Sequence, residues 1–101
     1  MTPEQIARLA DMPALRAAID ALDRDLVALL ATRSALIDRA AAIKADAGLP
    51  ARIDARVEEV AQNARDNAAR AGLDPDLAEQ LWRVMMDHFI AQEARQLGET
   101  E

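Results

Sequence analysis

Two cationic residues, Arg33 and Lys44, occupy positions where the sequence pattern predicts apolar side chains. Upstream of each, apolar residues recur at steps of three and four, the spacing of a helix face that packs against other structure. A further step of four from Leu29 reaches Arg33, and a step of four from Ala40 reaches Lys44. The apolar positions of this stripe are Leu15, Ile19, Leu22, Leu26, Leu29, Ile37 and Ala40.

The spacing of these two cations suits a small dianion. At 100° and 1.5 Å per residue, eleven steps bring them within about 20° of one face and about 16 Å apart. Arg16 lies near the same edge, and Arg56 follows the next break in the pattern, so carboxylates held by guanidinium groups are a natural ligand. Alternatively, Arg33 and Lys44 extend to water or pair with acidic residues of a neighbouring helix, which avoids the cost of an unpaired buried charge.

A carboxylate interrupts a second apolar stripe. Trp82, Met86 and Phe89 share one helix face, and the next step of four is Glu93. Glu93 therefore lies either at the solvated edge or in a pocket, where burial favours its protonated form. Trp82 is interpreted as a core residue, and His88 as a core or surface histidine rather than a catalyst.

Composition excludes several classes of protein. The 101 residues suit one domain, and 24 Ala and 12 Leu against 13 Val, Ile and Thr favour helix. The absence of Cys excludes disulfides, thiolate zinc sites and thiol nucleophiles, and one His without clustered carboxylates argues against a metal site. A net charge of −6 argues against nucleic-acid binding.

Nothing in the sequence indicates a membrane or a secretion signal. No apolar run approaches the roughly 18–20 residues that cross a bilayer. The first eleven residues carry neither a basic region nor the apolar region of a signal peptide. We therefore expect a cytoplasmic protein.

The elements that must position these residues are three helices. Asp11 and Pro13 begin a helix over 12–47, which Gly48 ends. Asp54 is expected to cap a second helix over 54–71, which ends at Gly72, and Asp74 with Pro75 begins a third over 74–97. The domain thus spans 12–97, between an N-terminal extension (1–11) and a frayed tail (98–101).

The first helix is too long to be covered by the other two. At 1.5 Å per residue it extends about 50 Å, and each of the others is near half of that length. An apolar half left in water is unfavourable, so we expect an intertwined homodimer, an all-α bundle in which the long helices pair. An extended coiled coil is the alternative.

Several short matches carry a resemblance to the all-helical chorismate mutase family, over about residues 12–96. The spacing of Arg16, Arg33, Lys44 and Arg56 is its most specific part. The matching stretches are Leu15-Arg16, Ile19-Asp20, Leu22-Asp23, 29–33, Ile43-Lys44, Ala55-Arg56-Val57, 71–74, Leu81-Trp82-Arg83, Phe89-Ile90 and Glu93.

The resemblance implies an interlocked homodimer that converts chorismate to prephenate without a cofactor. Arg16 resembles the arginine that one subunit donates to its partner's site, and Arg33 and Arg56 resemble the clamp on the two substrate carboxylates. Lys44 resembles the donor to the ether oxygen whose bond breaks, with Glu93 as the second group there. The resemblance therefore makes Lys44, Glu93 and Arg33 the catalytic residues, with no metal.

Glu93 departs from the family pattern, because bacterial members commonly carry Gln there. An ionised carboxylate would repel the developing oxyanion, so Glu93 helps only when protonated. Activity is therefore predicted to rise toward mildly acidic pH, and Glu93→Gln should flatten the profile. Gln92 is an alternative if the register is shifted by one residue.

Val57 is the second departure, since family members often have a substrate-binding glutamate there. With Val57 at this position, the chain resembles the branch that includes isochorismate-pyruvate lyases. No residue is assigned to the contact with the substrate hydroxyl. The alternatives to a mutase are therefore such a lyase, which yields salicylate, and a helical interaction module without catalysis.

Overall fold

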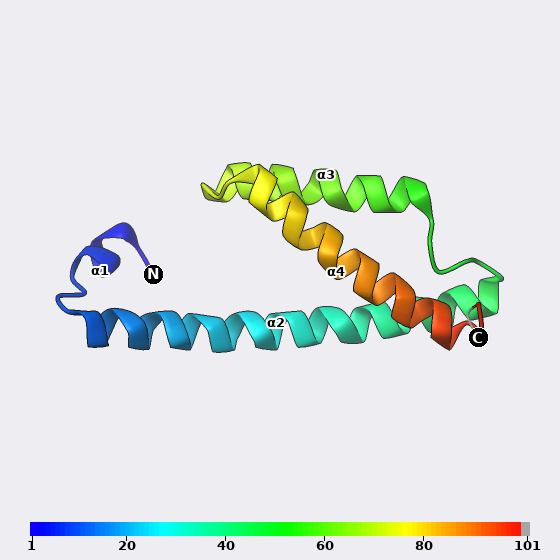
Figure 1. Ribbon diagram of the computed structural model, residues 1–101, viewed down its shortest axis with the longest axis horizontal. Helices are drawn as coiled ribbons and strands as arrows, with labels where there is room; N and C mark the ends of the chain where they lie inside the picture. The colour runs from blue at the N-terminus through cyan, green and yellow to red at the C-terminus, as the bar shows by residue number, and fades with distance from the viewer. Residues whose placement is uncertain (100–101) are drawn as a thin grey trace. The chain divides into compact units, whose positions relative to one another are not determined.

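The chain is all-helical, as its composition predicts. The computed structural model describes residues 1–99, within which no strand occurs. The helices within these residues are α1 (Pro3–Ala7), α2 (Met12–Ala47), α3 (Asp54–Ala71) and α4 (Pro75–Gln96), as labelled in Figure 1. The chain divides into two compact units, residues 1–35 and 36–101, and the division falls within α2.

The ends of α2 follow the predicted signals. The Ala14 amide donates to the Asp11 carboxylate at 2.8 Å, which confirms Asp11 as the capping residue. At the other end Gly48 takes a φ of +71°, and the Leu49 amide donates to the Lys44 carbonyl at 2.9 Å. This glycine-dependent turn satisfies a carbonyl that the helix leaves open.

The connection from α3 to α4 was also predicted, but the start of α3 was not. Gly72 ends α3 with a φ of +79°, and the Asp74 carboxylate accepts the Asp76 amide at 2.9 Å. Asp54, however, is not a cap: Ile53 holds the N-cap position without a side-chain bond. The Asp54 carboxylate instead accepts from Arg52 Nε at 2.8 Å, so it is already occupied.

Helix α1 was not predicted, so the expected count of three helices was short by one. Thr2 forms a capping box with Gln5, in which each side chain bonds the other residue's backbone amide, and Pro3 starts the helix. Five residues are too few for the periodicity that reveals longer helices, which is why the pattern missed it.

In the unit of residues 1–35, the predicted apolar stripe of α2 is exposed. Ile19 is 49% exposed and Leu29 is 68% exposed, and Leu22 and Leu26 are exposed as well. Within α2 as a whole, Ala41 is the one residue classed as buried. The first half of α2 therefore presents a large apolar surface in the single chain.

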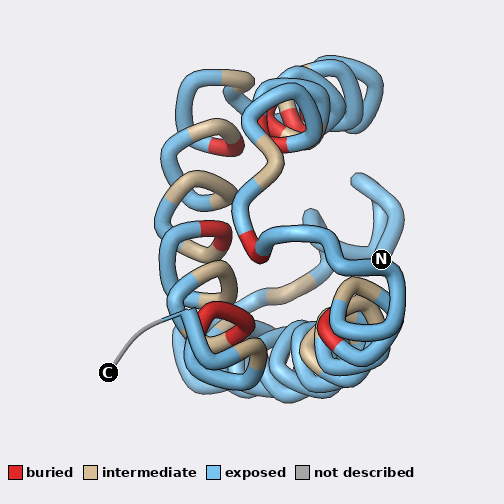
Figure 2. The backbone as a smooth tube through the Cα atoms, turned by 90° about the vertical axis from the view of Figure 1, so that its right-hand side faces the viewer, coloured by how far each residue is buried: buried red, intermediate tan, exposed pale blue. Residues whose placement is uncertain are grey.

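In the second unit, α3 and α4 form an antiparallel hairpin whose core is built from small residues. The buried residues of α3 recur at steps of four, three and four: Val57, Ala61, Ala64 and Ala68. Figure 2 shows how few positions are buried. Trp82 packs against the alanine end of this core, as predicted, whereas Ile90, not Phe89, follows Met86 in the stripe. His88 is exposed, with its ring edge on Phe89.

Candidate active site around Lys44 and Glu93

The ammonium group of Lys44 and the carboxylate of Glu93 meet near the ends of α2 and α4. Lys44 Nζ lies 2.6 Å from Glu93 Oε2 and donates a second hydrogen bond to the Ala51 carbonyl oxygen at 2.7 Å. Glu93 is only 4% exposed. The two residues that broke the apolar patterns of separate helices are thus brought together as an ion pair in which Glu93 is buried and Lys44 is half-buried.

The helical register of α4 explains why Glu93 reaches this point. Met86 and Ile90 pack in the hairpin core, and a step of three from Ile90 places Glu93 on the same buried side. Gln92 faces elsewhere, since its amide donates to Asp38 Oδ1 at 3.1 Å. The structure therefore places Glu93 rather than Gln92 beside Lys44.

The Lys44 ammonium keeps donor capacity for a ligand. It carries three N–H groups, and within residues 1–99 two of them are used, by Glu93 and Ala51. A partner is needed because a buried carboxylate is costly unless it is paired and hydrogen-bonded. The ammonium group and the carboxylate together form an electrically neutral pair.

Two of the predicted cations lie in the other unit. Arg33 is half-buried, and its Nη1 atom is buried without a hydrogen-bond partner in the described part of the chain. Arg16 is exposed on the first turns of α2. An arginine nitrogen left without an acceptor is uncommon in a folded protein and suits an anionic ligand.

Arg56 is not joined to Lys44 or Glu93. Its side chain is 62% exposed and forms an ion pair with Glu59, three residues further along α3. The next residue, Val57, is buried against Ala61 and Met86 in the hairpin core. An apolar side chain in this place offers no hydrogen bond to a ligand.

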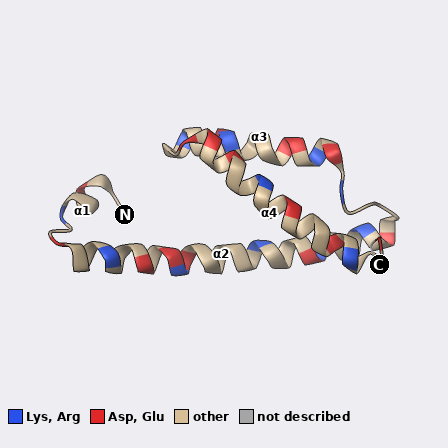
Figure 3. Ribbon diagram, viewed as in Figure 1, with Lys and Arg blue, Asp and Glu red and all other residues tan. Residues whose placement is uncertain are grey.

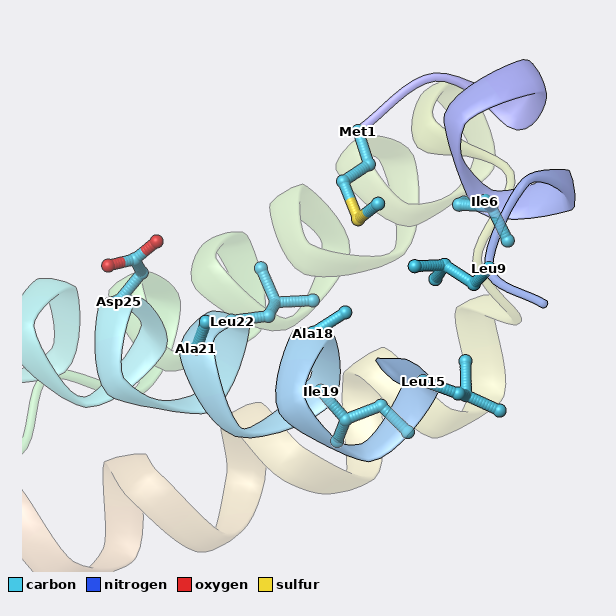
Figure 4. A pocket seen from close by; sticks show the side chains of 9 residues that line it. All are labelled: Met1, Ile6, Leu9, Leu15, Ala18, Ile19, Ala21, Leu22 and Asp25. Carbon is cyan, nitrogen blue, oxygen red and sulfur yellow. The ribbon is translucent and has the colours of Figure 1, made fainter. Parts of the chain in front are cut away.

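Two hollows elsewhere do not suit a dianion. One, of about 510 Å³ in the first unit, is lined by aliphatic side chains of α2 and of residues 1–9, and its one charged residue is Asp25 (Figure 4). The other, about 300 Å³ on the hairpin, contains Arg65 and Arg83, which already bind Asp76, Glu79 and Glu58. A carboxylate ligand would be repelled in the first and would have to displace ion pairs in the second.

Three residues that the sequence analysis did not single out belong to this end of the structure. Asp38 accepts hydrogen bonds from both Gln92 and Gln96, at 3.1 and 3.2 Å. Ala51 donates its amide to Glu99 Oε1 at 2.9 Å, besides accepting from Lys44. Gly98 predicts the turn that precedes Glu99. The contact between Glu99 and Ala51 has no such local signal, because the two residues are far apart in the sequence.

Charge and helix length bear on the other classes of site. Figure 3 shows Lys and Arg interspersed with Asp and Glu along α2, α3 and α4. Among the residues that the structure describes, no group of three or more His, Asp or Glu side chains is placed to hold a metal ion. Every helix in residues 1–99 is too short or too polar to span a bilayer.

Comparison with known proteins gives one family. Residues 15–94 match the family model for chorismate mutase type II. Two T-proteins are similar to the chain: that of Enterobacter agglomerans is 34% identical over 85 residues, and that of Haemophilus influenzae is 37% identical over 79. The matches cover 83% and 78% of this chain but only 23% and 21% of the T-proteins.

A third relative is matched along nearly its whole length. The isochorismate pyruvate lyase of Pseudomonas aeruginosa is 34% identical over 102 residues, which covers 98% of this chain and 94% of the lyase. The chain is thus comparable in length to the lyase, whereas it spans under a quarter of the T-proteins.

Proposed function

Because the chain belongs to the chorismate mutase type II family, we propose that it rearranges chorismate to prephenate. The observation that carries the proposal is the Lys44 ammonium, held between Glu93 and the Ala51 carbonyl with one N–H left for a ligand. The rearrangement is pericyclic, so it needs no nucleophile. It is therefore compatible with a chain that has no cysteine.

In this reaction the protein contributes shape and charge. As the carbon–oxygen bond of the ether breaks, negative charge develops on the oxygen, and Lys44 donates its free N–H to that atom. Arg33, whose Nη1 lacks a partner in the described chain, binds one substrate carboxylate. Fixing the carboxylates holds the substrate in the compact conformer that reacts, which removes much of the entropic barrier.

Arg56 binds the other carboxylate after exchanging its partner. In the free protein its guanidinium pairs with Glu59 on the surface, an arrangement that contributes little to stability because both groups are solvated. A substrate carboxylate with bidentate geometry competes well for the same guanidinium. Substrate binding therefore draws Arg56 away from Glu59.

The active protein is a homodimer whose sites are completed across the interface. The exposed aliphatic side chains on the first half of α2 support this, because a second copy of the same surface removes them from water. The apolar hollow beside α1 belongs to the same surface. Arg16, exposed on α2, is the cation that each subunit donates to its partner.

Substitution of Lys44 tests the mechanism. Lys44→Ala should lower kcat by about 100- to 1000-fold, the usual loss when one preorganised donor to a developing oxyanion is removed. Arg39→Ala is the matched control, because Arg39 is an exposed cation of α2 for which no ion pair is formed in residues 1–99. Equal activity of Lys44→Ala and Arg39→Ala with chorismate would contradict the proposal.

The pH dependence tests the part played by Glu93. A carboxyl group that carries a proton donates a hydrogen bond instead of repelling the developing oxyanion, so kcat should rise toward acidic pH. Glu93→Gln supplies a neutral donor at every pH, so its profile should be flat. A sloping profile that persists in Glu93→Gln would assign the titration to another group.

Isochorismate pyruvate lyase activity is the second candidate. Two observations favour it: the match to the Pseudomonas aeruginosa lyase extends over nearly the whole chain, and Val57 is buried where a hydroxyl-binding glutamate is usual. Incubation with chorismate and, separately, with isochorismate distinguishes the candidates by their products, prephenate or salicylate. A protein inactive on both substrates would be a non-catalytic helical module.

A further inference from the structure

Ala51, in the connection between α2 and α3, is held by hydrogen bonds on both sides. Its carbonyl oxygen accepts from Lys44 Nζ at 2.7 Å, and its amide donates to Glu99 Oε1 at 2.9 Å. The residue is only 3% exposed, so water has little access to replace either bond. Ala51 thus links the proposed catalytic lysine to a carboxylate that lies beyond the end of α4.

Glu99 is an exposed residue, but its backbone is fixed by the turn that ends α4. Gly98 adopts a φ of +73°, and its amide donates to the Arg95 carbonyl at 3.2 Å. The Glu99 amide donates to the Ala94 carbonyl at 2.8 Å. This pair of bonds is the Schellman motif, which ends a helix and sets the direction of the residue after the glycine.

The other end of the link is equally defined. Leu49 donates its amide to the Lys44 carbonyl at 2.9 Å through the same motif around Gly48, so the backbone of Lys44 is held by the turn that ends α2. Its side chain is held by Glu93 and Ala51. The position of the ammonium group therefore depends on where the Ala51 carbonyl lies.

We infer that Glu99 is a positioning residue: by binding the Ala51 amide it keeps the Ala51 carbonyl against Lys44, and so aims the remaining Lys44 N–H at the substrate. This inference rests on the proposed function. Without the carboxylate, a nearly buried amide lacks its acceptor, and the connection shifts to satisfy it. Lys44 then keeps Glu93 as its one fixed partner and swings toward it, away from the substrate oxygen.

Three variants test the role of Glu99. Glu99→Ala removes the acceptor and should lower kcat about five- to tenfold with KM changed less than about twofold, because a displaced donor acts on the transition state more than on binding. Glu99→Gln keeps an acceptor oxygen and should stay within about twofold of the wild type. Asp87→Ala, which removes an exposed carboxylate of α4, is the control.

Exchange of the Ala51 amide with deuterium gives a readout independent of catalysis. Protection should be lost in Glu99→Ala and retained in Glu99→Gln and Asp87→Ala. In an active wild type, unchanged kcat in Glu99→Ala, or equal losses in the Ala and Gln variants, would overturn the inference alone. A wild type inactive on both substrates would overturn the proposed function and this role together, and amide exchange would then report only whether the bond exists.

Discussion

The α3–α4 hairpin and the first half of α2 differ in the exposure of their apolar residues. The hairpin hides its stripe within the chain, where Ala61, Ala64 and Ala78 allow the two helices to approach closely. The first half of α2 carries larger aliphatic residues, such as Ile19 and Leu29, and leaves them exposed. Both are regular helices, so the difference lies in the partner: the hairpin buries its stripe within the chain, whereas for the first half of α2 a second copy of the chain is proposed.

The cations of the two regions differ in the same way. On the hairpin, Arg83 forms ion pairs with Glu79 at 2.7 Å and Glu58 at 3.1 Å, so its charge is compensated by carboxylates of the hairpin itself. In the first unit, Arg33 keeps a buried nitrogen with no acceptor in residues 1–99. A satisfied arginine supports structure, whereas an unsatisfied one is suited to an external anion.

A charge placed in the hairpin core should have the largest effect on the protein. Ala61 is buried in a cluster with Val57 and Met86. Ala61→Asp should destabilise the fold by about 3 kcal/mol or more, because the carboxylate would be buried without a partner. Urea unfolding followed by circular dichroism measures the loss. Asn63→Asp, at an exposed position of the same helix, should change stability little. Similar stability of the two variants would contradict a core between α3 and α4.

Charges on the exposed stripe of α2 should weaken assembly and leave the hairpin folded. Leu22→Glu with Leu29→Glu should weaken dimerisation at least about 100-fold, as burial of two carboxylates opposes association. Ala17→Glu with Ala28→Glu places the same charges on the opposite face and is the control. Sedimentation should show a monomer only for the leucine pair. A wild type that is monomeric would overturn the dimer.

The smallest effect concerns the ion pairs of the hairpin. Hydrogen bonds from Arg83 and then Arg65 lower the pKa of Glu79 from its ordinary value. Because the pKa of Glu79 is lower in the folded protein than in the unfolded chain, ionised Glu79 stabilises the fold at pH values above the unfolded-state pKa. This stabilisation is lost as the pH falls through the folded-state pKa.

The melting temperature is the measurement for these pairs. Because the groups are solvated, Glu79→Gln should lower it by only roughly 1–3 °C at pH 7, and the difference should shrink as the pH falls. Asp87→Asn is the control on the same helix. A difference between wild type and Glu79→Gln that grew with acidity would contradict this direction of the shift.

Much of this protein follows from local sequence. Asp11, Gly48, Gly72 and Asp74 act at helix ends through their own backbone and side-chain geometry, and the structure confirms each of them. Asp54 and α1 were misjudged for local reasons also: Arg52 competes for the Asp54 carboxylate, and five residues give no periodicity.

Local sequence predicted α2, α3 and α4, and it marked Lys44 and Glu93 as charges in apolar stripes, because periodicity and capping act over a few residues. The family resemblance assigned both side chains to one site, but only tertiary structure decided that they pair directly, that Gln92 turns to Asp38, and that Glu99 reaches Ala51. Such contacts join residues about fifty positions apart, and their distances depend on how whole helices pack.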